Sequence, residues 1–105
     1  MSEATYIDQM AEAIREHTPP DLVPDDADDP RSLFRLYALL ALAVGEAVTT
    51  REVHDAWAVW MLGRGQAHES IVPFEALDAA VQTEDEPFVT AIRAALRANA
   101  QPPHA

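Results

Sequence analysis

The stretch RSLFRLYALLALAVGEAV, residues 31–48, decides the fold of this 105-residue chain. Its apolar side chains fall on nearly every side of a helix rather than on one stripe; they are Leu33, Phe34, Leu36, Tyr37, Leu39, Leu40, Leu42 and Val44. A helix that is apolar on all sides is buried in a core or in an oligomer interface. The stretch therefore predicts the central helix of an all-α domain.

An amphipathic helix is expected before this stretch, from about Glu3 to His17. Apolar residues recur there at helical spacing and predict one buried stripe, made of Tyr6, Ile7, Met10, Ala13 and Ile14. Pro19 and Pro20 end the helix, because proline lacks a backbone donor and clashes with the preceding turn.

Residues 19–30, PPDLVPDDADDP, connect these two helices. We expect an ordered or semi-extended linker that Leu22 and Val23 anchor to the core. Its aspartates lack the spacing and the distal glutamate of a calcium-binding loop. They fit a helix start better, with Asp29 as the N-cap and Pro30 in the first helical position.

A third helix is predicted after the central stretch. Thr49 and Glu52 have the spacing of a capping box, in which each side chain bonds the backbone N–H of the other residue. The helix runs to about Leu62, and Gly63 and Gly65 end it.

The last third of the chain predicts shorter elements. Residues 73–77, PFEAL, indicate a helical turn. Thr83 and Glu86 repeat the capping-box spacing, and Pro87 fits the first turn of a final helix that ends near Asn99.

Length and composition predict one domain over residues 1–105, a small bundle of about four to five helices with its helical core at 31–100 and a frayed tail at 101–105. Hydrophobic residues make up 49% of the chain, which favours a folded protein over a disordered one. The chain has no cysteine, so disulfides and cysteine-ligated zinc are excluded.

The formal net charge of -11 bears on possible partners. Nucleic acid and anionic membranes both bind a basic face, so neither is an expected partner. No apolar stretch reaches the ~20 residues that span a bilayer, and the first residues lack the basic and apolar regions of a signal peptide. We expect a cytoplasmic protein.

Catalysis and metal or cofactor binding are not expected. No serine lies in a G-x-S-x-G turn. His68, Glu69 and Ser70 are adjacent in sequence, whereas the members of a catalytic triad converge in space from separate positions. The four histidines are scattered along the chain and predict no metal site; they are His17, His54, His68 and His104.

Two tryptophans on the third helix indicate a possible binding edge. Trp57 and Trp60 are three residues apart, so their side chains project within roughly 60° of each other. We expect Trp57 to face the core beside Val53. Trp60 would then lie at the edge of the core, where a ligand or a second subunit would cover it.

A longer pattern begins on the same helix. A His-x-x-Trp pair is followed, after a loop, by residues 71–77, IVPFEAL, and eight residues later by an aspartate; the positions that define the pattern are His54, Trp57, Pro73, Phe74, Leu77 and Asp85. Through these elements, residues 51–96 resemble the ryanodine-receptor (RyR) domain, with conservative exchanges at Ile71 and Phe74. Gln82 departs from that family, which usually has lysine there. The chain also resembles small actinobacterial proteins of unknown function.

The resemblance implies a mostly helical binding or assembly module, sometimes a ligand sensor in bacteria, without catalytic residues. The matched residues also have a physical interpretation of their own. The apolar ones are expected to form a small core that folds the loop back on the helix: Trp57, Pro73, Phe74 and Leu77. His54 can bond the loop backbone, and Asp85 can cap the last helix.

Two functions remain open. The first is protein–protein assembly, with a homodimer favoured, because the second and third helices carry more apolar surface than a domain of this size easily buries. The alternative is a sensor of a small molecule of nucleotide type, bound between the third helix and residues 64–72. Its candidate residues are Trp60 for stacking, with Arg51, Arg64 or His68 for an anion.

Overall fold

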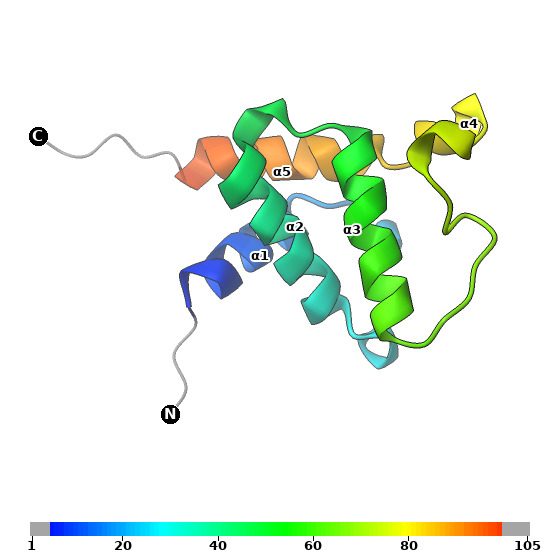
Figure 1. Cartoon of the computed structure of the whole chain (residues 1–105). Coiled ribbons are helices and arrows are strands. Elements are labelled where there is room, and N and C mark those ends of the chain that lie inside the picture. Colours follow the sequence, from blue (N-terminus) through cyan, green and yellow to red (C-terminus); the bar gives the residue numbers. More distant parts are fainter. Residues whose placement is uncertain (1–4, 100–105) are drawn as a thin grey trace, which may run out of the picture.

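A computed structural model describes residues 5–99 of the chain. Within this range, four helices of 11 to 15 residues and one single-turn helix pack together (Figure 1). They are α1 (Tyr6–Glu16), α2 (Pro30–Val44), α3 (Thr50–Gly63), α4 (Ala79–Gln82) and α5 (Glu86–Asn99). No strand occurs among these residues, so the predicted all-α fold is confirmed. The expected tail at 101–105 lies outside the described residues, as does the predicted helix start before Thr5.

Helix α2 is the central element and contacts α1, α3 and α5. Asp29 caps it as predicted, with its carboxylate accepting from the Ser32 backbone N–H at 3.4 Å, and Pro30 is the first helical residue. The helix ends at Val44, earlier than expected. Gly45 follows with φ 73°, a backbone conformation that favours glycine.

The core lies on one side of α2 only. Leu33, Phe34 and Tyr37 are buried there, whereas Leu39 and Leu42 on the opposite side are exposed. Of the two expected ways to bury α2, a core or an oligomer interface, the core of the chain covers one side only. Its second apolar side is left on the surface.

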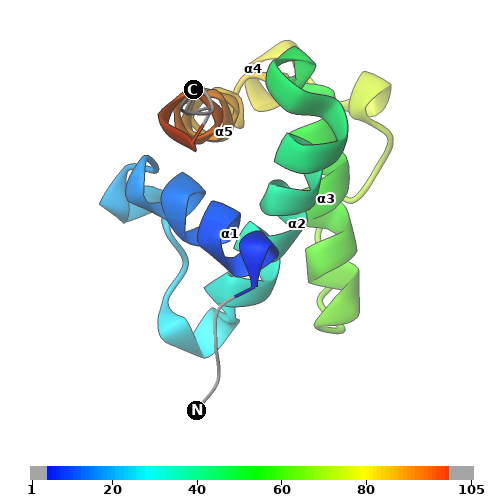
Figure 2. The same cartoon turned by 90° about the vertical axis from the view of Figure 1, so that its left-hand side faces the viewer.

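Helices α1 and α5 close the core against α2. Figure 2 shows α5 nearly end-on, with α1 beside it and with α2 and α3 on the other side. Ile14 and Ile92 are fully buried between them. Tyr6 was expected in the buried stripe of α1 but is 70% exposed, because it lies at the first position of the helix, off the row that Ala11 and Ile14 bury.

The segment between α1 and α2 contains two short 3-10 turns, Pro20–Leu22 and Asp26–Asp28. Val23 packs against the core as predicted. Leu22, the other expected anchor, is more than a third exposed. The linker is thus ordered and held chiefly by one apolar side chain.

Helix α3 follows the turn Gly45–Ala47 and runs back alongside α2 (Figure 1). Its predicted capping box is present, with the Thr49 backbone N–H donating to Glu52 Oε1 at 2.6 Å. The chain then returns from the last turn of α3 toward its first turn. There the predicted turn forms over Phe74–Ala76 and contacts α3.

The start of α5 differs from the sequence prediction. The Thr83 hydroxyl donates to the Ala80 carbonyl at 2.8 Å and so ends α4, a helix that the sequence did not indicate. Thr83 therefore does not cap α5. The backbone carbonyl of Asp85 takes that position, accepting from the Val89 N–H at 3.2 Å, and Pro87 lies in the first turn as predicted.

Candidate functional site

The residues proposed for an anion site lie apart. Arg51 begins α3 and Arg64 follows its end, so about 20 Å of helix separates them. Arg51 is paired with Glu75 and lies over the Phe74 ring, with 5.1 Å from guanidinium carbon to ring centroid. Arg64 is paired with Asp28 at 2.9 Å. The structure thus does not bring the two arginines together, and each is already held by an acidic side chain.

Trp60 does not lie at the edge of the core, where it would be open to a ligand or a second subunit. Trp60 is only 7% exposed, and its indole N–H donates to the Asp29 carbonyl at 3.1 Å. The Arg64 guanidinium covers it, 4.7 Å from the ring centroid. Trp57 packs against the core as expected, although it is only half-buried. Trp60 is buried because the last residues of the linker before α2 fold against it.

His54 joins the returning loop to α3. It is buried, and its Nε2 lies 2.7 Å from the Val72 carbonyl oxygen. Because a carbonyl only accepts, Nε2 carries the proton and donates. The ring stacks on Trp57, with centroids 5.8 Å apart, and lies 6.2 Å from Phe74. The predicted bond from His54 to the loop backbone is confirmed.

The rest of the RyR-like pattern is only partly packed. Phe74 and Leu77 are half-buried, but Pro73 is exposed, so its expected place in the small core is wrong. Gln82 stands where the family usually has lysine. Its side-chain amide donates to the carbonyls of Phe74 and Leu77 at 3.0 and 3.2 Å, which fixes the turn through hydrogen bonds instead of a charge.

Asp85 has an unusual environment for a carboxylate. Burial raises its pKa to about 6, even though His54 nearby acts in the opposite direction. The carboxylate makes no hydrogen bond to another residue within the described range 5–99, so it does not cap α5 through its side chain as predicted. It therefore remains available to an external donor.

His68 lies on the other side of Trp57. Its ring meets the Trp57 ring edge-on at 5.2 Å between centroids, and its Nδ1 accepts from the Ser70 backbone N–H at 3.0 Å. Together with His54 and Asp85 it lines a small hollow of about 170 Å³. Among the described residues, no group of three or more histidine and acidic side chains is arranged to hold a metal ion.

The most extensive candidate surface is the outer side of α2 and α3, which we call the α2–α3 face: Leu36, Leu39, Leu42, Val59 and Leu62. Leu39, Val59 and Leu62 are each more than half exposed, at 54%, 57% and 61%. Leu42 lies three residues beyond Leu39 and therefore next to it on the helix surface. Contiguous exposed apolar side chains of this kind mark interaction sites.

A groove of about 510 Å³ runs along this face between the two helices. Ile7, Leu36, Leu39, Val59 and Trp60 line its apolar part. The sequence indicated the apolar excess of the two helices, but it did not indicate that Ile7 of α1 joins the same groove.

Two arginines stand at the rim of the groove, and both are paired within the chain. Arg35 contacts the Asp8 carboxylate through two nitrogens, at 2.7 and 3.2 Å, and the hydrogen bond from Arg35 is the main reason that the pKa of Asp8 is lowered to about 2. Arg64 is paired with Asp28. The rim charges are therefore neutralised before anything binds.

The α2–α3 face carries little acid, and the acidic residue that lines its groove is Asp29, the N-cap of α2. The chain has 18 aspartates and glutamates, yet residues 30–45 and 56–68 contain none. These two stretches form nearly all of α2 and the later part of α3. The negative charge of the molecule is thus kept away from its largest exposed apolar surface.

Comparison with models of protein families identifies the family of the chain. It matches the model of the Domain of unknown function (DUF7701) over residues 5–97. The chain belongs to the DUF7701 family. No curated protein and no solved structure matches it. Membership in DUF7701 assigns no function, so the functional conclusions below depend on the contacts of this chain.

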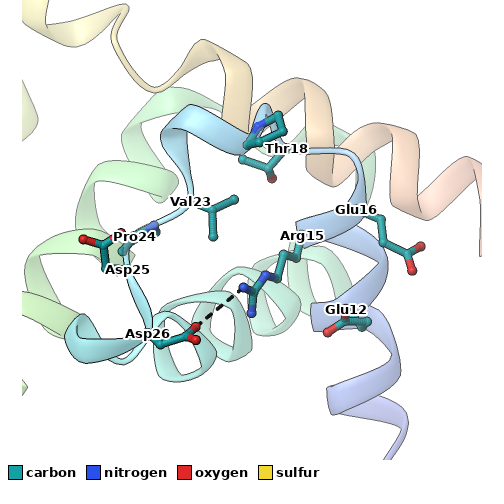
Figure 3. A pocket seen from close by; sticks show the side chains of 9 residues that line it. Glu12, Arg15, Glu16, Thr18, Val23, Pro24, Asp25 and Asp26 are labelled. Carbon is teal, nitrogen blue, oxygen red and sulfur yellow. Dashed lines mark ion pairs between the residues drawn. The ribbon is translucent and has the colours of Figure 1, made fainter.

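A second, larger hollow in this DUF7701 protein is strongly acidic. It measures about 540 Å³ and is formed by α1 and the linker before α2, with Glu12, Glu16, Asp25 and Asp26 among its lining residues. Figure 3 shows the Arg15 side chain pointing across it toward Asp26, and the two form an ion pair at 3.9 Å. The carboxylates are spread around an open surface and do not converge on one point.

No helix among residues 5–99 of this DUF7701 protein has the length and apolar character needed to cross a membrane.

Proposed function

We propose that this chain is a non-enzymatic assembly module that forms a homodimer through its α2–α3 face. The proposal is supported chiefly by one observation: Leu39, Val59 and Leu62 are exposed together on a face that carries little acid. Covering these side chains with a second copy removes apolar surface from water, which is the main favourable contribution to protein association.

The charge distribution leaves the α2–α3 face as the place where two copies can meet. Two chains that each carry a formal charge of -11 repel each other over most of their surface. They can approach closely where no carboxylate would be buried, because an unpaired buried charge is strongly unfavourable. The α2–α3 face meets this condition.

The shape of the face suits a symmetric contact. In a two-fold dimer the same patch is used on both chains. The rows that carry Val59 and Leu62 on one copy would pack into the groove between α2 and α3 of the other, as ridges of side chains pack into grooves between helices. Two pairs of helices would then form a four-helix interface.

The resemblance to the RyR domain supports a binding or assembly role of this general kind, in the cytoplasm. The nucleotide-type sensor has less support. Its candidate arginines are about 20 Å apart along α3 and are each paired with an acidic side chain. A phosphate-bearing ligand would have to displace Glu75 or Asp28 to reach either one.

Thermal unfolding at several protein concentrations tests this proposal. A homodimer that dissociates on unfolding has a midpoint that rises with protein concentration. We expect such a rise for the unmodified chain and its loss in Leu39→Glu, which places a charge at the centre of the face. Val72→Glu is the matched control, because Val72 is also exposed but lies on the returning loop. A midpoint independent of concentration in the unmodified chain would overturn the homodimer.

A further inference from the structure

A cavity of about 380 Å³ lies beside the inner side of α3, and Trp60 is the one residue that lines both this cavity and the groove of the α2–α3 face. Helix α2 contributes Tyr37, α3 contributes Trp57, and the region around the start of α5 contributes Glu84, Asp85 and Phe88. The Tyr37 and Phe88 rings contact each other, with centroids 5.3 Å apart. The cavity thus has aromatic walls and two carboxylates at one end. Its volume is within the range of small-ligand sites, roughly 300–1,000 Å³.

Tyr37 lines this cavity from α2 and brings a hydroxyl group to it. The residue is 1% exposed, and its hydroxyl makes no hydrogen bond to another described residue. Burial raises the pKa of the hydroxyl, and the charge of Asp85 raises it further, so the two groups are close enough to interact electrostatically. No fully buried side-chain polar atom among the described residues lacks a hydrogen-bond partner, so the Tyr37 hydroxyl is open to the cavity, where water or a ligand can bond it.

Asp85 supplies a second polar group that is open to the cavity. Its carboxylate is partly buried and has no hydrogen-bond donor among the described residues. A ligand that fills the space beside Tyr37 and Asp85 must therefore bring donors of its own. A carboxylate accepts only, and a phenol accepts as well as donates.

The charges around the cavity favour a cation. Glu84 and Asp85 line it, and no arginine or lysine does. His54 faces Asp85 from α3, and His68 lines the neighbouring small hollow that shares Trp57 and Asp85. Aromatic faces attract organic cations through their quadrupoles, so the walls and the carboxylates select the same sign of charge.

We propose that this cavity binds a protonated amine that carries a small apolar or aromatic body. The ammonium group donates hydrogen bonds to the Asp85 carboxylate and to the Tyr37 hydroxyl oxygen. The body of the ligand packs against Trp57 and Phe88. None of these four residues belongs to the α2–α3 face, so the site does not depend on the homodimer.

Titration of the intact chain with 2-phenylethylamine, followed by tryptophan fluorescence, tests the site. Both tryptophans line the cavity, so binding changes their emission. The matched probe is 2-phenylethanol, which has the same shape without the charge. We expect saturable binding of the amine at neutral pH, at least tenfold tighter than that of the alcohol, and weaker amine binding as the pH falls through about 6, where Asp85 is protonated.

Three variants locate the binding. Asp85→Asn keeps the shape of the side chain and should weaken amine binding at least tenfold, while Tyr37→Phe should weaken it severalfold. Asp78→Asn removes the same charge from an exposed position before α4 and should leave binding unchanged. The proposal is overturned if the amine and the alcohol bind equally, if neither binds, or if Asp78→Asn weakens binding as much as Asp85→Asn. The last result would mean general attraction to an acidic surface.

Discussion

The two sides of α3 are similar in apolar content and differ in what covers them. On the inner side, Trp60 packs under the linker before α2 and His54 bonds the returning loop. On the outer side, Val59 and Leu62 are 57% and 61% exposed. Segments distant in sequence therefore decide which apolar side of a helix becomes core, and the uncovered side is left for a partner.

The largest expected effect contrasts the two sides directly. Trp60→Ala removes a buried ring and its hydrogen bond, so we expect the free energy of unfolding to fall by about 3–5 kcal/mol. Leu62→Ala, on the outer side, should lower it by less than about 1 kcal/mol. Urea denaturation at low protein concentration, where dimerisation contributes little, measures both. Equal losses would show that the distinction between the sides is wrong.

His54→Gln tests how the inner side is covered. The substitution removes the ring that stacks on Trp57 and contacts Phe74, and it replaces the short ring bond to the Val72 carbonyl with that of a flexible amide. We expect a loss of about 1–3 kcal/mol in unfolding free energy and faster hydrogen exchange in residues 64–77. Arg51→Gln is a suitable control, because Arg51 pairs with Glu75 on the exposed side of the same turn. Unchanged exchange in His54→Gln would contradict the role of His54 in holding the loop.

Asp85→Asn should stabilise the protein, in a way that depends on pH. Burial raises the pKa of Asp85 from 3.8 to about 6, so between these values the folded state binds more protons than the unfolded state. The contribution of Asp85 to stability therefore falls as the pH rises through this window. Asn cannot ionise, and it caps helices as well as Asp.

The free energy of unfolding of Asp85→Asn should exceed that of the unmodified chain by about 1–2 kcal/mol at pH 7, after allowance for partial exposure of the carboxylate. This difference should vanish below about pH 4. Thermal unfolding of both proteins across pH 4–8 measures it. A gain that is the same at every pH would show that the Asp85 charge is not its cause.

Local signals in the sequence predicted much of the fold. The capping box at Thr49 and the Asp29–Pro30 helix start each depend on neighbouring residues, and both formed as predicted. The single-turn α4 was missed, because a helix so short has no apolar period to detect. The burial of Trp60 was not predicted for a different reason.

The burial of Trp60 depends on Asp29, which lies 31 residues earlier in the chain, and helical periodicity carries no information about that contact. The same limit applies to the cavity. The pattern singled out Trp57 and Asp85, but the sequence did not show that Tyr37 of α2 faces them. The α2–α3 face was easier to anticipate, because an excess of apolar residues is visible in composition alone.

The mass of the intact chain in solution tests the central claim most directly. Sedimentation equilibrium over a wide range of protein concentration should show a rise from the mass of one chain to that of two, while Leu39→Glu stays at one chain throughout and Val72→Glu behaves as the unmodified protein. A single-chain mass for the unmodified protein at every concentration would contradict the homodimer and leave the α2–α3 face to a different protein partner.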